Sequence, residues 1–211
     1  FRRSGKANPK KGIFGAYAVW CAERGDFDEL NRCFTSFVAG GRDRSAPPGS
    51  PDGGHYHFDL LIALLHVYFK FHDKLRAEAT ERFRQALREA CEPQGRIYRY
   101  DFGFSNTNHP FKCATIEALA GEILEDEDVR LSGVNKLRGL SRKLAAGIGR
   151  PYANTGYSGS VSEFNSPTYA APQIIPATLL RTWSKDAETR ALGSLYQELM
   201  LMDALGHWHP P

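Results

Sequence analysis

The stretch FDLLIALLHVYFKFHDKLRAEATERFRQALREAC, residues 58–91, contains two helical patterns of opposite character in immediate succession. From 58 to 72 the residues are apolar on nearly every side, whereas from 74 to 91 the apolar residues form one stripe among charged ones. A helix that is apolar all round is buried, and one with a single apolar stripe lies at the surface. The stretch therefore predicts an inner helix, Phe58–His72, followed by an outer helix, Lys74–Cys91.

The same alternation occurs three more times along the chain. Inner helices are predicted at Ile13–Glu23, Pro110–Leu124 and Pro167–Trp183. Outer helices are predicted at Phe27–Val38, Val129–Ala146 and Ala187–Leu205. Only a few polar residues separate the two helices of each pair, so the pattern indicates four antiparallel αα-hairpins.

Three long segments, about 40–54, 93–108 and 147–166, join one hairpin to the next. Each leads from an outer helix into the following inner helix, so all three lie at the same end of the helices. The repeat of about 50 residues is longer than that of the familiar two-helix solenoids. We therefore predict an all-α fold, an α/α toroid, in which the N-termini of the inner helices open onto the long-loop face.

We assign residues 1–211 to one α/α-toroid domain and expect it to be part of a longer chain, because a closed toroid needs more hairpins.

Charge and hydropathy limit the classes of partner that the chain is expected to bind. The formal net charge is only +3, and the basic residues of the outer helices alternate with acidic ones, so no nucleic-acid partner is expected. No apolar run has the length needed to cross a bilayer, so we expect a soluble protein without a membrane partner. The oligomeric state is not indicated.

Neither metal nor cofactor binding is indicated by a known motif. The pairs His55-x-His57 and His207-x-His209 are weak metal signals, and hydrogen bonds from these loop histidines to the backbone are the simpler expectation. Four cysteines lie within predicted helices without CxxC spacing, and we expect them to be buried free thiols: Cys21, Cys33, Cys91 and Cys113. A cross-hairpin pair of Cys21 with Cys33 stays open.

Polar and aromatic residues gather where the long segments enter the inner helices. One segment ends in Ser166-Pro167, a good N-cap with proline at the first helical position, and another ends in Asn108-His109-Pro110. Helix N-termini carry unpaired N–H groups and partial positive charge, which suit an anionic ligand. The predicted concavity is lined by Asn108, His109, Glu163, Asn165 and Tyr169, with further binding candidates at His55, His57, Tyr100, Asn106 and Tyr157.

The run Asn106-Thr107-Asn108-His109, which opens an inner helix, resembles the toroid-type alginate lyases and, more loosely, the heparinase-like polysaccharide lyases. In those families an Asn-His pair begins one inner helix and a tyrosine lies near the start of a later one, as Tyr169 does here. The resemblance covers about residues 106–180. The segment SEFNSPTY, residues 162–169, is also similar to one in uncharacterised bacterial helical-toroid proteins.

The resemblance implies β-elimination on a polysaccharide or oligosaccharide that contains uronic acid, without a cofactor. Asn108 would bind and neutralise the uronate carboxylate, His109 or Tyr169 would remove the C5 proton, and Tyr169 would protonate the leaving oxygen. Such a lyase would be periplasmic or secreted. The lyases commonly have an arginine near the tyrosine, and this chain has Glu163 there instead.

Two other functions stay open on the same scaffold. A glycoside hydrolase needs a pair of carboxylates, for which Glu163 with Asp101 or Asp59 is the best choice. A non-catalytic helical module would use its long loops only to bind a partner. Glu117 and Glu122 are further candidates for carboxylates in a cavity, and the acidic run 126–128 is expected to cap a helix rather than to bind a metal.

Overall fold

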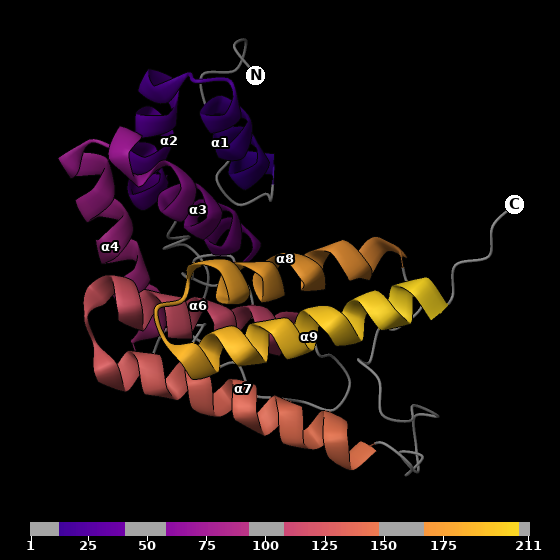
Figure 1. Cartoon of the computed structure of the whole chain (residues 1–211). Coiled ribbons are helices and arrows are strands. Elements are labelled where there is room, and N and C mark those ends of the chain that lie inside the picture. Colours follow the sequence, from indigo (N-terminus) through magenta and orange to yellow (C-terminus); the bar gives the residue numbers. More distant parts are fainter. Residues whose placement is uncertain (1–12, 41–57, 93–107, 148–166, 207–211) are drawn as a thin grey trace, which may run out of the picture. The chain divides into compact units, whose positions relative to one another are not determined.

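A computed structural model of the chain describes residues 13–40, 58–92, 108–147 and 167–206. Every regular element in these ranges is helical (Figure 1). The chain divides into two compact units, unit 1 within Phe1–Arg99 and unit 2 within Tyr100–Pro211. The all-α class that the hydrophobic patterns predict is confirmed.

Unit 1 has two layers of helices. It comprises α1 (Ile13–Glu23), α2 (Phe27–Gly40), α3 (Phe58–Phe71), the 3₁₀ turn η1 (His72–Lys74) and α4 (Ala77–Cys91). The inner helix α1 packs against α3, and the outer helix α2 packs against α4, where the rings of Phe34 and Phe83 lie 5.4 Å apart. The inner helix α3 is buried along most of its length, as its apolar sequence predicts.

The connection between α3 and α4 differs from the predicted hairpin turn. After η1, Leu75 and Arg76 are extended, so α4 begins at Ala77 instead of Lys74. The main packing partner of α4 is α2 rather than α3. The physical reason is the buried Asn31 of α2, whose amide donates to the Lys74 carbonyl (3.1 Å) and whose Oδ1 accepts from the Arg76 N–H (2.6 Å). These two bonds hold the start of α4 against α2.

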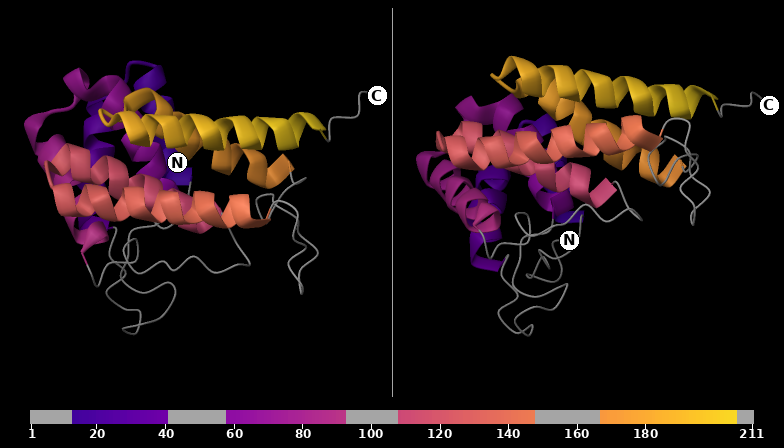
Figure 2. Two further views of the ribbon diagram at one scale, coloured as in Figure 1. Left: turned by 60° about the horizontal axis from the view of Figure 1, so that its bottom comes forward. Right: turned by 90° about the horizontal axis from the view of Figure 1, so that it is seen from below.

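Unit 2 contains two antiparallel hairpins. Its helices are α6 (Asn108–Leu124), α7 (Glu127–Gly147), α8 (Pro167–Trp183) and α9 (Ala187–Gly206). The inner helix α6 packs against the inner helix α8, while α7 and α9 run alongside one another in the same direction (Figures 1 and 2). Burial on every side holds for α6 between 110 and 121, but it is wrong for α8, where Ile175 is 48 % exposed.

Aspartates cap three of the outer helices. In each case the carboxylate accepts a hydrogen bond from the backbone N–H three residues later, which satisfies a donor that the first turn leaves unpaired. The pairs are Asp26 with Glu29 (3.2 Å), Asp126 with Val129 (3.1 Å) and Asp186 with Thr189 (2.7 Å). The prediction that the acidic run 126–128 caps a helix is therefore confirmed.

Glycines allow the helices of the unit 2 hairpins to approach closely. A Cβ added to Gly133 of α7 would lie 2.8 Å from the Ala114 carbonyl oxygen of α6, and one added to Gly193 of α9 would lie 2.6 Å from the Arg181 nitrogen of α8. No side chain fits at such distances without moving a helix backbone. At Gly139, also on α7, an added Cβ meets nothing within 4 Å.

We expect Gly133→Ala to lower the free energy of unfolding by roughly 1–3 kcal/mol, because α6 and α7 must move apart to admit the methyl group. The matched control is Gly139→Ala on the same helix, which should be neutral or stabilise the protein by about 0.5–1 kcal/mol through helix propensity. Urea denaturation followed by circular dichroism measures both. Equal effects of the two substitutions would contradict the close approach.

Candidate functional site

The candidate site lies at the end of unit 2 where α6 and α8 begin. At the opposite end of these helices, the Glu122 carboxylate accepts hydrogen bonds from the Ser184 hydroxyl and from the Lys185 N–H, the latter at 2.7 Å. Glu122 is near the C-terminus of α6, and Ser184 directly follows α8, so the two inner helices run in the same direction. Their N-terminal turns, which carry His109 and Tyr169, therefore lie at the same end of unit 2.

Three of the predicted site residues belong to described helices. Asn108 and His109 open α6, with His109 half-buried, and Tyr169 lies in the first turn of α8. The other predicted residues lie outside the described ranges: His55, His57, Tyr100, Asn106, Tyr157, Glu163 and Asn165. That all of these residues line one concavity stays a prediction.

A basic side chain lies buried in the first turns of α6. Lys112 is only 4 % exposed, and its spacing of four residues places it on the same side of the helix as Asn108. Removing a charged amino group from water is costly unless anions or other hydrogen-bond acceptors surround it. Lys112 was missed in the sequence analysis, although its spacing from the Asn108-His109 pair was a visible signal.

Three buried side-chain atoms in the described part of unit 2 have no hydrogen-bond partner: Thr115 Oγ1, Glu117 Oε2 and Gln173 Oε1. The Glu117 Oε2 atom is ion-paired with Lys136 at 2.7 Å, which leaves Thr115 and Gln173. Thr115 of α6 is completely buried, and Gln173 of α8 is 2 % exposed. Within the described parts of the chain, neither the Thr115 Oγ1 atom nor the Gln173 Oε1 atom has a partner. Because buried polar atoms in proteins are nearly always hydrogen-bonded, each indicates a position where a further group can bind.

Two prolines interrupt the backbone hydrogen bonding in the N-terminal half of α8. Pro172 and Pro176 lie inside this helix and have no N–H group. The carbonyl oxygens of Thr168 and Pro172 therefore lose the donor that an α-helix supplies four residues later. The first half of α8 therefore lacks two of the regular backbone hydrogen bonds of an α-helix.

The two inner-helix carboxylates do not serve as free groups of a cavity. Glu117 is completely buried, and its carboxylate lies 2.7 Å from the Lys136 amino group of α7. Burial raises the pKa of Glu117 above its ordinary value of 4.5, while the hydrogen bond and charge of Lys136 oppose that rise. Glu122 is occupied by the connection between α8 and α9. Both carboxylates link helices, which corrects their predicted role.

Neither carboxylate pair proposed for a hydrolase can be assembled from the described residues. Asp59 lies half-buried in the first turn of α3, whereas Glu163 and Asp101 are outside the described ranges. In those ranges no group of three or more His, Cys, Asp or Glu is placed to hold a metal ion. The cysteines are buried free thiols, as predicted.

Comparisons with known proteins add no assignment. No protein-family model, curated protein or solved structure matches this chain. A search of the described helices for one that is both long and apolar enough to cross a membrane finds none. Function is therefore inferred from the helix register, from the buried polar groups and from the residues at the start of α6 and α8.

The Glu117–Lys136 pair generates a pH-dependent prediction. Because the folded-state pKa of Glu117 is raised, its contribution to stability is fully present below the unfolded pKa and is lost as the pH rises through the folded pKa. Lys136→Met removes the charge that offsets this loss. We expect the variant to lose roughly 3 kcal/mol of unfolding free energy at about pH 7, and less at lower pH.

Urea denaturation at about pH 5 and about pH 8 measures this difference. The double variant Glu117→Gln with Lys136→Met is the control. Without an ionisable group at position 117, the additional pH dependence caused by Lys136→Met should disappear. An equal loss of stability at both pH values in the single variant would show that the pair is not electrostatically coupled.

Proposed function

We propose that the chain is an α/α-toroid carbohydrate-active enzyme, a polysaccharide lyase that cleaves a uronic-acid-containing glycan by β-elimination. The observation that carries the proposal is the shared direction of α6 and α8. It brings the Asn108-His109 pair and the turn that carries Tyr169 to one end of unit 2. This is the arrangement that the resemblance to the toroid-type lyases requires.

The layered packing supports the toroid. In unit 1 the inner helices α1 and α3 pack together, and so do the outer helices α2 and α4. In unit 2 the inner helices α6 and α8 pack together, and the outer helices α7 and α9 are in contact. A toroid continues this arrangement of inner on inner and outer beside outer around a ring.

The chemistry needs stabilisation of negative charge next to the proton that is removed. In the proposed mechanism Asn108 binds the uronate carboxylate, His109 or Tyr169 removes the C5 proton, and Tyr169 protonates the leaving oxygen. The N-terminus of α6 adds unpaired N–H groups and partial positive charge. Lys112, buried one turn further on, adds a cationic group to the first turns of α6.

The elimination is tested by the absorbance of the unsaturated uronate that it leaves on the product. Alginate, pectate, hyaluronan and heparin serve as substrates. We expect His109→Ala and Tyr169→Phe each to lower kcat by on the order of 10²-fold or more, because each removes a proton-transfer group. Asn108→Ala should also lower kcat, since its amide matters most when charge develops on the carboxylate.

The control is His72→Ala, a substitution of an exposed histidine in unit 1, which should leave kcat unchanged. Circular dichroism checks that helical content is the same in all variants. Turnover close to wild type in both His109→Ala and Tyr169→Phe would refute the lyase. Reducing ends without an unsaturated product, abolished by Glu163→Gln, would identify a hydrolase. Binding without any cleavage would identify a non-catalytic module.

A further inference from the structure

We propose that Thr115 and Gln173 form an uncharged subsite that binds the hydroxyl groups of a sugar unit, and that this subsite selects an unsulfated glycan. The inference rests on the proposed function, because it deepens the same site by naming the class of substrate. Its starting point is Thr115 Oγ1 and Gln173 Oε1, the two buried atoms that have neither a hydrogen-bond partner nor an ion-pair partner within the described residues.

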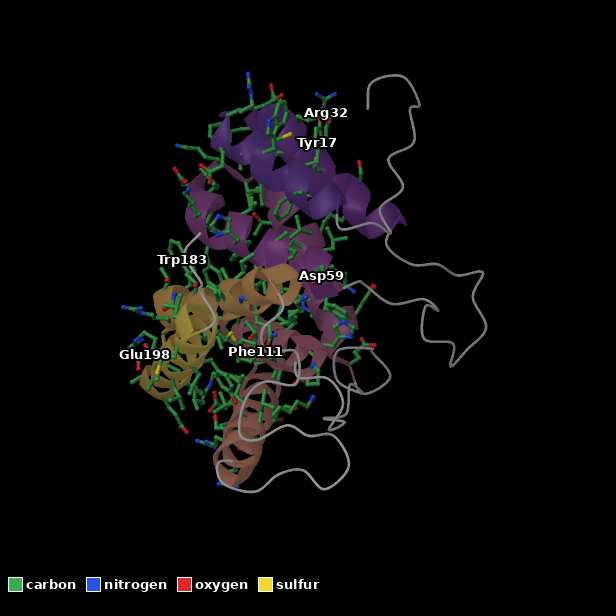
Figure 3. The ribbon with its side chains drawn as sticks, turned by 90° about the vertical axis from the view of Figure 1, so that its right-hand side faces the viewer. Tyr17, Arg32, Asp59, Phe111, Trp183 and Glu198 are labelled. Carbon is green, nitrogen blue, oxygen red and sulfur yellow. The ribbon has the colours of Figure 1, made fainter. Side chains whose placement is uncertain are left out.

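Thr115 faces the neighbouring hairpin. It is four residues after Phe111 and seven before Glu122, so the three residues share one side of α6. The Phe111 ring lies 4.5 Å from the ring of Tyr196 on α9, and Glu122 binds the connection between α8 and α9. Phe111 is labelled in Figure 3. The side of α6 that carries Thr115 is therefore turned toward α8 and α9.

Gln173 belongs to the corresponding side of α8. It precedes Ala177, Leu180 and Ser184 at spacings of four, seven and eleven residues, which place all four on one side of the helix. Ala177 and Leu180 lie against Gly193 of α9, and Ser184 contacts Glu122 of α6. Gln173 therefore points into the interior of unit 2, which agrees with its 2 % exposure.

The helix register brings the two side chains to similar levels. At about 1.5 Å per residue, Thr115 lies roughly 10 Å along α6 from Glu122, and Gln173 lies roughly 16 Å along α8 from Ser184. Since Glu122 and Ser184 are in contact, the two unpartnered groups differ in level by about one helical turn. Both lie about two turns below the helix starts that carry Asn108 and Tyr169.

The chemistry of these groups selects the ligand. The Gln173 Oε1 atom only accepts hydrogen bonds, while the Thr115 hydroxyl accepts or donates. Such a set binds O–H donors, which are the secondary hydroxyls of a sugar. A sulfate ester presents only acceptor oxygens, so it cannot donate to the Gln173 Oε1 atom as a sugar hydroxyl does. Unsulfated uronans such as alginate or pectate fit this subsite, and heparin does not.

The test measures binding in a variant that does not turn over substrate. In the His109→Ala background, isothermal titration with an unsulfated oligouronate is compared for Thr115→Val, for Gln173→Met and for the matched control Thr178→Val. Thr178 is an exposed threonine of the same helix as Gln173. We expect Thr115→Val and Gln173→Met each to weaken binding by roughly three- to tenfold, the value of one lost hydrogen bond, and Thr178→Val to have no effect.

A second measurement separates folding from binding. Replacing an unpaired buried polar group with an apolar group of similar shape is nearly neutral or stabilising, so both variants should keep or raise the melting temperature without ligand. In enzymes with His109 intact, both should raise KM for the unsulfated substrate. Unchanged affinity with a raised melting temperature would overturn the subsite and assign both atoms to bound water. Tighter binding of heparin than of the unsulfated oligouronate would also overturn it.

The outcomes distinguish this inference from the proposed function. If the wild-type enzyme forms an unsaturated product but Thr115→Val and Gln173→Met leave KM unchanged, the subsite is refuted and the lyase is supported. If no unsaturated product forms but both variants weaken binding of the oligouronate, the subsite is supported and the lyase is refuted. If the wild-type protein neither cleaves nor binds any of these glycans, both proposals are refuted.

Discussion

The Glu122 carboxylate fixes the second hairpin of unit 2 to the first. One of its oxygens accepts the Ser184 hydroxyl and the other accepts the Lys185 N–H, so both are engaged by the connection between α8 and α9. Hydrogen bonds to an ionised acceptor are stronger than those between neutral groups. The contact joins the C-terminal ends of two inner helices. It therefore sets the register of α6 relative to α8, and with it the relative level of their N-terminal turns at the candidate site.

Unit 1 uses a different residue for the same task. Asn31 bonds to the backbone on both sides of the extended connection that leads into α4, and it does so from an outer helix. Near it, the Tyr17 hydroxyl of α1 donates a hydrogen bond to Glu29 of α2, which links the two helices, and Arg32 of α2 forms an ion pair with the same carboxylate. Tyr17 and Arg32 are labelled in Figure 3. In both units, polar side chains that bind the backbone of a later connection join one helix pair to the next.

The helices were predictable because their signals are local. Ile13–Glu23 and Pro167–Trp183 have the bounds that apolar patterning and the proline at position 167 predict. The Asp caps of α2, α7 and α9 were equally visible, although only the one at Asp126 was recognised. Asn31 and Glu122 were not predictable in their linking roles, since their partners are about 43 to 63 residues away in sequence. Glu117 and Lys136 are closer in sequence, 19 residues apart, but their pairing also depends on how two helices pack.

Only the part of the candidate site that lies at the first turns of α6 and α8 was predictable from the sequence. The patterns placed the beginnings of α6 and α8 at one end, and the direction of both helices in the structure agrees. The burial of Lys112, Thr115 and Gln173 was not recognised, because burial is a property of packing. The same holds for the missing hydrogen-bond partners of Thr115 Oγ1 and Gln173 Oε1. Most of the other site residues belong to the long segments between hairpins. These segments have no regular hydrophobic pattern from which a structure could be predicted.

Because the Glu122 contact lies at the C-terminal end of each inner helix of unit 2, a small tilt of either helix around this contact moves its N-terminal end the most. α6 has 17 residues, so it is about 25 Å long, and its polar attachment to α8 lies close to one end. A tilt of about 5° around that attachment displaces the far end of the helix by about 2 Å, which is comparable to the change in length of a side chain by one bond. The separation of the N-terminal turns of α6 and α8 is thus sensitive to a carboxylate at the opposite end of both helices.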